Sequence, residues 1–121
     1  FFCCRAAFGL MKKQGGGTII NMSSVAGVQA WSGTGTYSAS KHAIMALTKS
    51  LADEGRAYRI KVSALCPGGV ADELVDATPE VRAASEKIDP FDIAEAALYL
   101  ASLGPQAVVH QLVVDRLGAD W

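Results

Sequence analysis

The chain has 121 residues, half of them hydrophobic, and a formal net charge of −1. This length supports one modest hydrophobic core and is too short for two comfortable domains. No basic block stands out in the sequence, so nucleic acids and anionic membrane surfaces are poor partners. The longest apolar runs are far below the roughly 18 residues that a membrane-spanning helix requires.

The sequence contains three cysteines and no C-x-x-C pair. Cys3 and Cys4 are adjacent, whereas Cys66 stands alone in an apolar run. This pattern favours free thiols in a reducing compartment, the cytoplasm, over disulfides or a zinc site. The chain begins at Phe1 and lacks the basic leader and cleavage site of a signal peptide. We therefore expect a fragment that starts inside a helix.

The first two elements are predicted by periodicity and by a glycine run. Apolar residues recur at three- to four-residue steps over residues 1–13, and Lys12 and Lys13 suit a helix C-terminus. Three glycines at 15–17 then end this helix. Residues 18–22 are apolar and β-branched, which predicts a short buried strand.

A longer helix is predicted over residues 37–54, after a small and polar loop over residues 23–35. Thr36 is the expected N-cap. The expected apolar stripe of this helix consists of Ala43, Ile44, Leu47 and Leu51. A second strand follows over residues 60–66, and the Pro-Gly-Gly sequence at 67–69 ends it.

The remaining segments continue the alternation of helices and strands. Residues 72–87 are polar, with one short helix expected after Pro79. Pro90 is expected to open a helix that runs to about residue 103, because proline is tolerated in a first turn. Residues 111–115 are the third predicted strand. Such alternation predicts parallel strands joined by right-handed crossovers, with helices on both faces of the sheet.

Tyr37 and Lys41 are the residues that most strongly indicate a catalytic site. Residues four apart lie on the same side of a helix, with a rise of roughly 6 Å between them. A phenol releases its proton reluctantly at neutral pH, and a nearby ammonium group stabilises the phenolate. Ser24 precedes Tyr37 by thirteen residues and follows the first predicted strand. Its hydroxyl can complete a three-sided site around a carbonyl or alcohol oxygen.

Three segments carry a resemblance to a known family. In order, TIINMSS at 18–24, YSASK at 37–41 and PGGV at 67–70 resemble the short-chain dehydrogenase/reductase family in its single-domain form. A Tyr-x-x-x-Lys pattern alone is common by chance, whereas three segments at the family's spacing are specific. The resemblance is clear over residues 1–70 and looser over 92–96 and 111–115.

The resemblance implies an α/β fold, a three-layer Rossmann-type, doubly wound parallel sheet. Residues 1–121 would be the C-terminal part of one NAD(P)-binding domain, with about three strands and their flanking helices. The helices that precede residue 14 and follow residue 36 resemble those of the family's dimer interface. The resemblance therefore implies a homodimer or homotetramer at full length.

The same resemblance implies roles for individual residues. Tyr37 would be the general acid/base, and Ser24 would hydrogen-bond the substrate oxygen. Lys41 would hold the nicotinamide ribose and assist Tyr37. The cofactor, NAD or NADP, would also meet the loop formed by Pro67, Gly68, Gly69 and Val70. The family's relay asparagine and the residues that select NAD or NADP would precede Phe1.

Two positions depart from the family pattern. Asp72 stands where a threonine usually contacts the nicotinamide amide, which leaves this contact open. Arg59 stands just before the second strand, where the family commonly has glycine, and we expect Gly55 to end the helix instead. Residues 71–88 correspond to the family's variable substrate lid.

Several polar residues have simpler structural explanations. Ser23 is expected to be a strand-end residue, and Asn21 to make a structural hydrogen bond in a buried strand. Trp31 fits a substrate wall and loop packing equally well. His110 has no ligand partner in the sequence, so no metal is inferred.

The leading interpretation is an NAD(P)-dependent oxidoreductase of the short-chain alcohol dehydrogenase/carbonyl reductase type, acting on a secondary alcohol or ketone. We expect the isolated fragment to be inactive. One alternative is a related epimerase or dehydratase, although too few residues follow Val70 for a separate substrate domain. Another is a non-catalytic nucleotide-binding scaffold, which the presence of both Tyr37 and Lys41 argues against.

Overall fold

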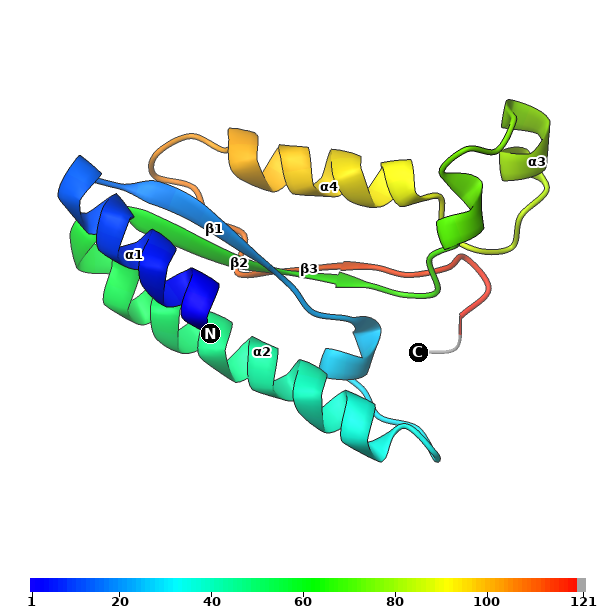
Figure 1. Ribbon diagram of the computed structural model, residues 1–121, viewed down its shortest axis with the longest axis horizontal. Helices are drawn as coiled ribbons and strands as arrows, with labels where there is room; N and C mark the ends of the chain where they lie inside the picture. Colours follow the sequence, from blue (N-terminus) through cyan, green and yellow to red (C-terminus); the bar gives the residue numbers. More distant parts are fainter. Residues whose placement is uncertain (120–121) are drawn as a thin grey trace.

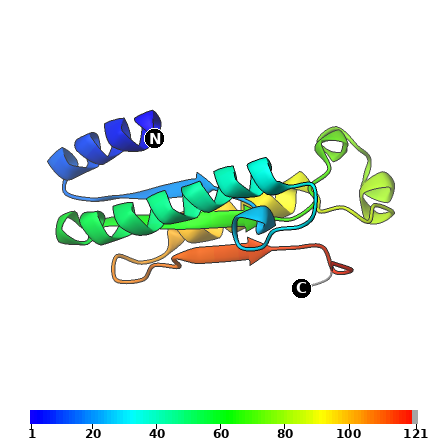
Figure 2. The ribbon, with the colours of Figure 1, turned by 90° about the horizontal axis from the view of Figure 1, so that it is seen from below.

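The computed structural model describes residues 1–119 and shows a three-stranded parallel sheet between two layers of helices (Figure 1). The strand order is β1-β2-β3. Helices α1 and α2 cover one face of the sheet, and α4 covers the other (Figures 1 and 2). The predicted parallel sheet with flanking helices is thus confirmed.

The central strand β2 (Ile60–Pro67) pairs on both sides. On one side, β1 (Gly17–Met22) runs in register from the Gly17–Ile60 pair to the Met22–Leu65 pair. On the other side, β3 (Gln111–Val114) pairs with residues 64–67. All but one residue of β2 are buried, as expected for a parallel strand that is covered on both faces.

The helices begin and end where local chemistry permits. Helix α1 (Phe2–Gln14) ends at Gly15, whose φ of 89° lies in the left-handed region that glycine adopts without strain. Helix α4 (Pro90–Ser102) begins after Asp89, whose carboxylate accepts the backbone N–H of Phe91. The remaining helical elements are α2 (Gly35–Gly55), α3 (Pro79–Ala83) and the 3-10 turns η1 (Val25–Gly27), η2 (Arg56–Tyr58) and η3 (Asp72–Leu74).

The hydrophobic core lies on both faces of β2. Leu65 packs under α4 with Ile88, Ile93 and Leu100. On the other face, the cluster comprises Ile19, Ile60 and Val62, with side chains from α1 and α2 packed against it. This two-sided packing fixes which strand residues face each helical layer.

The start of α2 differs from the prediction. The helix begins at Gly35 after Thr34, rather than at Tyr37 after Thr36. The Thr34 carbonyl already accepts the N–H of Ser38 at 2.7 Å, so the first helical bond closes two residues earlier. The Thr34 hydroxyl contacts Trp31 and Ser38 instead of capping an N–H of the helix.

The buried face of α2 also differs from the predicted stripe. Its fully buried residues are Ser38, Thr48 and Gly55, whereas Ala43 is exposed and Ile44 is only half-buried. Thr48 accepts a hydrogen bond from Asn21 at 2.9 Å. Small and polar residues let α2 lie close to the sheet, while Leu51 of the predicted stripe packs against the core cluster and Ala43 lies on the exposed side.

Candidate active site

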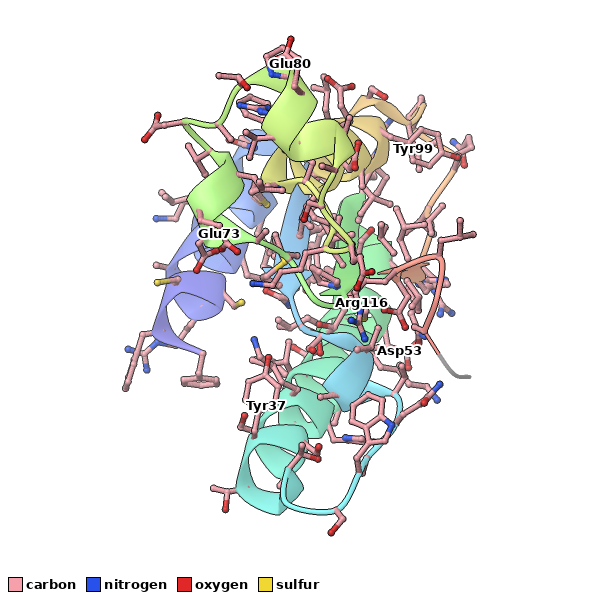
Figure 3. The ribbon with its side chains drawn as sticks, turned by 90° about the vertical axis from the view of Figure 1, so that its right-hand side faces the viewer. Tyr37, Asp53, Glu73, Glu80, Tyr99 and Arg116 are labelled. Atoms are coloured by element: carbon pink, nitrogen blue, oxygen red, sulfur yellow. The ribbon has the colours of Figure 1, made fainter. Side chains whose placement is uncertain are left out.

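The candidate site lies at the edge of the sheet where the parallel strands end. Ser24 follows β1, Pro67 ends β2 and residues 68–70 follow it, and Tyr37 and Lys41 lie in the first two turns of α2. Figure 3 views this edge directly, with Tyr37 on α2 and Glu73 on the segment after the loop. Ligands of open α/β sheets bind at this edge. The structure therefore brings the predicted site residues to one end of the molecule.

Ser24 is buried and held by its own turn. It is the N-cap of η1, and its Oγ accepts the backbone N–H of Ala26 at 3.1 Å. A serine hydroxyl has one donor hydrogen in addition to its acceptor capacity. The bond from Ala26 fixes the oxygen and leaves that hydrogen for another partner.

Tyr37 and Lys41 lie side by side on α2. The Tyr37 side chain is 52% exposed, and the Lys41 Nζ lies 5.7 Å from the centroid of its ring. The Lys41 ammonium also donates to the backbone carbonyl of Met22 at 3.4 Å. The Lys41 ammonium is thus held close to the Tyr37 ring.

The loop after β2 is fixed from two directions. The Gly68 N–H donates to the carbonyl of Val114 at 2.8 Å, and a Cβ at Gly68 would overlap the Asp115 carboxylate. Val70 forms a parallel bridge with Ile88. Gly69 remains exposed, so its backbone is accessible to a ligand.

Three further predicted positions have clear locations. Asp72, the departure from the family's threonine, is exposed at the start of η3, next to this loop. The Trp31 side chain is 45% exposed, and its backbone contacts Thr34. The predicted structural role of Asn21 is confirmed by its bonds to Thr48 and Cys4.

The structure also shows site-supporting residues that the sequence did not indicate. Ser23 Oγ donates to the backbone carbonyl of Lys41 at 3.0 Å, and Gly27 packs against both residues. Behind them, burial raises the pKa of the Cys66 thiol, while the Ser23 hydroxyl and the Lys41 charge offset part of this increase. No sequence pattern indicates this cluster, because it depends on the packing of the turn after β1 on α2.

Among residues 1–119, no group of three or more His, Cys, Asp or Glu side chains is placed to hold a metal ion. In the same part of the chain, no helix has the length and apolar character needed to cross a membrane.

Comparison with known proteins defines the family. Residues 1–83 match the family described as short chain dehydrogenase. A 3alpha-hydroxysteroid dehydrogenase of Mediterraneibacter gnavus is 41% identical over 110 residues, which are 84% of this chain and 44% of the relative. The chain therefore belongs to the short-chain dehydrogenase family, as its three sequence segments predicted.

Solved structures agree with this assignment. Acetoin dehydrogenase from Salmonella typhimurium matches with a TM-score of 0.77 and 34% identity, over 93% of this chain and 47% of that structure. The structure of ElxO with NADP bound matches with a TM-score of 0.79 and 28% identity, over 94% of this chain and 51% of that structure. The chain thus spans about half the length of the proteins it matches.

Proposed function

We propose that residues 1–121 are the C-terminal part of one NAD(P)-binding domain of an oxidoreductase. The enzyme transfers hydride between a nicotinamide cofactor and a secondary alcohol or ketone. The observation that carries this proposal is the convergence of Ser24, Tyr37 and Lys41 at the carboxyl edge of the sheet. Family membership and the coverage of about half of each relative support it.

The groups at this edge fit a nicotinamide nucleotide. Within residues 1–119, the Lys41 ammonium has one hydrogen bond, a long one to Met22, so its other N–H donors are available to ribose hydroxyls. The Tyr37 side chain is half-exposed beside it. The exposed backbone at Gly69 allows close approach of a flat ring. When bound, the nicotinamide supplies or accepts the hydride.

In the proposed reaction, side chains of this chain stabilise the charge on the substrate oxygen and exchange a proton with it. In the direction of reduction, the Ser24 O–H donates a hydrogen bond to the carbonyl oxygen and stabilises the negative charge that develops there. Tyr37 transfers its phenolic proton to that oxygen. The Lys41 ammonium stabilises the phenolate that remains. In the direction of oxidation, the same phenolate accepts the alcohol proton.

The names of two relatives support a substrate class. A hydroxysteroid dehydrogenase and an acetoin dehydrogenase are both named for secondary alcohols. We therefore propose the alcohol dehydrogenase/carbonyl reductase type for this enzyme.

We also propose a homodimer or homotetramer at full length. Exposed apolar residues on the outer side of the α1–α2 layer, such as Leu10 and Ala43, support an interface there.

We further propose a cytoplasmic location. Free thiols at Cys3, Cys4 and Cys66 support it.

The test uses the full-length protein that contains this chain. We expect it to oxidise NADH or NADPH when a ketone substrate is added. The panel of ketones contains 3-ketosteroids, the diketone that is reduced to acetoin, and β-ketoacyl thioesters. Cofactor binding without turnover on the whole panel would contradict the proposal. Lyase or isomerase activity without net cofactor consumption would contradict it in favour of the epimerase or dehydratase alternative.

A further inference from the structure

The end of β1 contacts Lys41 at two places. Ser23, which is 3% exposed, donates its hydroxyl hydrogen to the backbone carbonyl of Lys41 at 3.0 Å. The preceding residue, Met22, accepts the Lys41 ammonium with its backbone carbonyl at 3.4 Å. Two consecutive strand residues therefore hold both the backbone and the side-chain end of this lysine.

Gly27 brings the turn after Ser24 into direct contact with the same part of α2. A Cβ at Gly27 would overlap the Ser23 hydroxyl and lie 2.9 Å from the Lys41 carbonyl oxygen and 3.2 Å from its carbon. Distances below 3.0 Å are closer than a Cβ tolerates. The turn that carries Ser24 consequently packs closely on both the helical turn of Lys41 and the Ser23 side chain.

These contacts connect the two elements that supply the site. Ser24 directly follows Ser23, and its Oγ is fixed by Ala26 within η1. Tyr37 lies one helical turn before Lys41, so a shift of the Lys41 backbone would also move the Tyr37 side chain. The bond from Ser23 to Lys41 thus fixes the spacing between Ser24 and the Tyr37–Lys41 pair.

We infer that Ser23 is a positioning residue of the reaction, and that Gly27 provides the close contact that its hydrogen bond requires. Ser23 is buried and its hydroxyl hydrogen is already used, so it acts through Lys41 rather than on substrate. This inference rests on the proposed function. Displacement of a reacting group by about 1 Å can reduce the rate about 100-fold.

The experiment compares Ser23→Ala with the unsubstituted full-length enzyme. We expect kcat to fall about 10- to 100-fold, with a much smaller change in KM for the carbonyl substrate, because misplaced groups lower the rate more than binding. Ser23→Thr retains a hydroxyl and should restore most of kcat. Gly27→Ala should lower kcat in the same way, although the Ser23 hydroxyl remains.

Ser63→Ala is the matched control, because Ser63 is a buried serine of β2 that is 2% exposed and lies within the strand, before the loop at the site. We expect it to lose stability without a comparable loss of kcat. If Ser23→Ala and Ser63→Ala have equal effects on kcat, or if Ser23→Thr is no better than Ser23→Ala, the inference is wrong.

A second measurement does not depend on turnover. Hydrogen exchange of the backbone amides in residues 37–45 should accelerate in Ser23→Ala and stay unchanged in Ser63→Ala, since only the first variant releases this part of α2. Unchanged exchange in both variants would overturn the inference even if no substrate is found. Absence of turnover in the unsubstituted enzyme would instead count against the proposed function.

Discussion

At the scale of single residues, the site depends on the hydrogen-bond donors that contacts within residues 1–119 do not use. The Ser24 oxygen accepts from Ala26 and retains its own hydrogen. The Lys41 ammonium has one long contact, to Met22, and stands beside the half-exposed Tyr37 ring. Under the proposed function, these groups donate to the substrate oxygen, which is what reduction of a carbonyl requires.

Cys66 provides a prediction at the same scale. It is fully buried and its thiol pKa is raised by burial, whereas Cys3 is exposed. We expect iodoacetamide to alkylate Cys3 in the native protein and to modify Cys66 only after unfolding, because the thiolate is the reactive form. Peptide mass spectrometry with and without urea measures this. Equal rates at the two cysteines in the native protein would contradict the packing described.

The direction of the Cys66 pKa change also sets a pH dependence. The folded state binds the thiol proton more tightly than an unfolded thiol, whose reference pKa is 9.0. Its contribution to stability is therefore fully present below that value and is lost as the pH rises through the raised pKa of the folded state.

The catalytic candidates could be predicted from the sequence because their relations are local. Tyr37 and Lys41 are four residues apart in one helix, and Ser24 lies two residues after the end of β1, the strand that precedes this helix. The support from Ser23 and Gly27 could not be predicted in this way. It depends on how closely the turn after β1 packs on α2, which is a tertiary contact.

At the scale of elements, Arg59 is the one non-glycine residue with positive φ in the described part of the chain, at 59°. The left-handed conformation is unfavourable for residues with a Cβ. Gly55 ends α2 as expected, but with φ of −70°, so it does not replace a left-handed glycine. Gly55 is needed instead for close packing, since a Cβ there would lie 2.7 Å from the Ile60 carbonyl oxygen.

Arg59→Gly should therefore increase the free energy of unfolding by about 1 kcal/mol, because it relieves the left-handed strain. Urea denaturation of the full-length protein measures the change. Arg56→Gly is the matched control, since Arg56 has a φ of −54° and glycine should destabilise that position. A loss of stability in Arg59→Gly would show that the arginine side chain contributes more than the strain costs.

The segment that joins β2 to α4 is held by several contacts of Arg82. Its guanidinium donates to the carbonyls of Val75 at 2.8 Å and Ala77 at 3.1 Å, and pairs with Asp89 at 3.3 Å. It also lies 4.4 Å from the centroid of the Phe91 ring. One side chain thus connects η3, α3 and the start of α4.

Arg82→Gln should loosen residues 75–89 and cost about 1 to 2 kcal/mol, after allowance for partial exposure of the ion pair. Hydrogen exchange over this segment and KM for the carbonyl substrate should both increase, because the segment extends from the loop at the site. Lys87→Gln is the control: it removes the exposed Lys87–Glu73 pair, which should contribute little. Equal effects of the two variants would contradict the special role of Arg82.

The boundaries and buried faces of the helices and strands show which features local sequence patterns do not predict. Glycine runs and prolines predicted the ends of α1 and β2 to within one residue, and Pro90 was correctly predicted to open α4. The start of α2 was predicted two residues late because the carbonyl of Thr34, not the hydroxyl of Thr36, determines the first turn. Its buried face was predicted only in part: Leu51 packs on the core as expected, but close packing on the sheet favours Ser38 and Thr48 at the fully buried positions.

At the scale of the whole molecule, alternation of helices and strands was sufficient to predict a parallel sheet with helices on both faces. In the described residues, β1 pairs with β2 alone, so its other edge is open. An open edge of a parallel sheet favours pairing with another strand. This geometry supports the proposal that further strands of the same domain complete the sheet.

Residues 1–121 expressed alone should therefore bind neither NADH nor NADPH and should tend to aggregate. Isothermal titration calorimetry measures binding, and the full-length protein is the positive control. Micromolar affinity of the isolated chain would contradict the proposed division of the cofactor site.

The most direct test of the central proposal is the kinetics of Tyr37→Phe in the full-length enzyme. Loss of the phenolic proton should reduce kcat/KM for carbonyl reduction about 10²- to 10⁴-fold, the usual contribution of general acid–base catalysis. Tyr99→Phe, at an exposed position of α4, should change it little. Carbonyl reduction by Tyr37→Phe at the unsubstituted rate would contradict the assignment of this site as the catalytic centre.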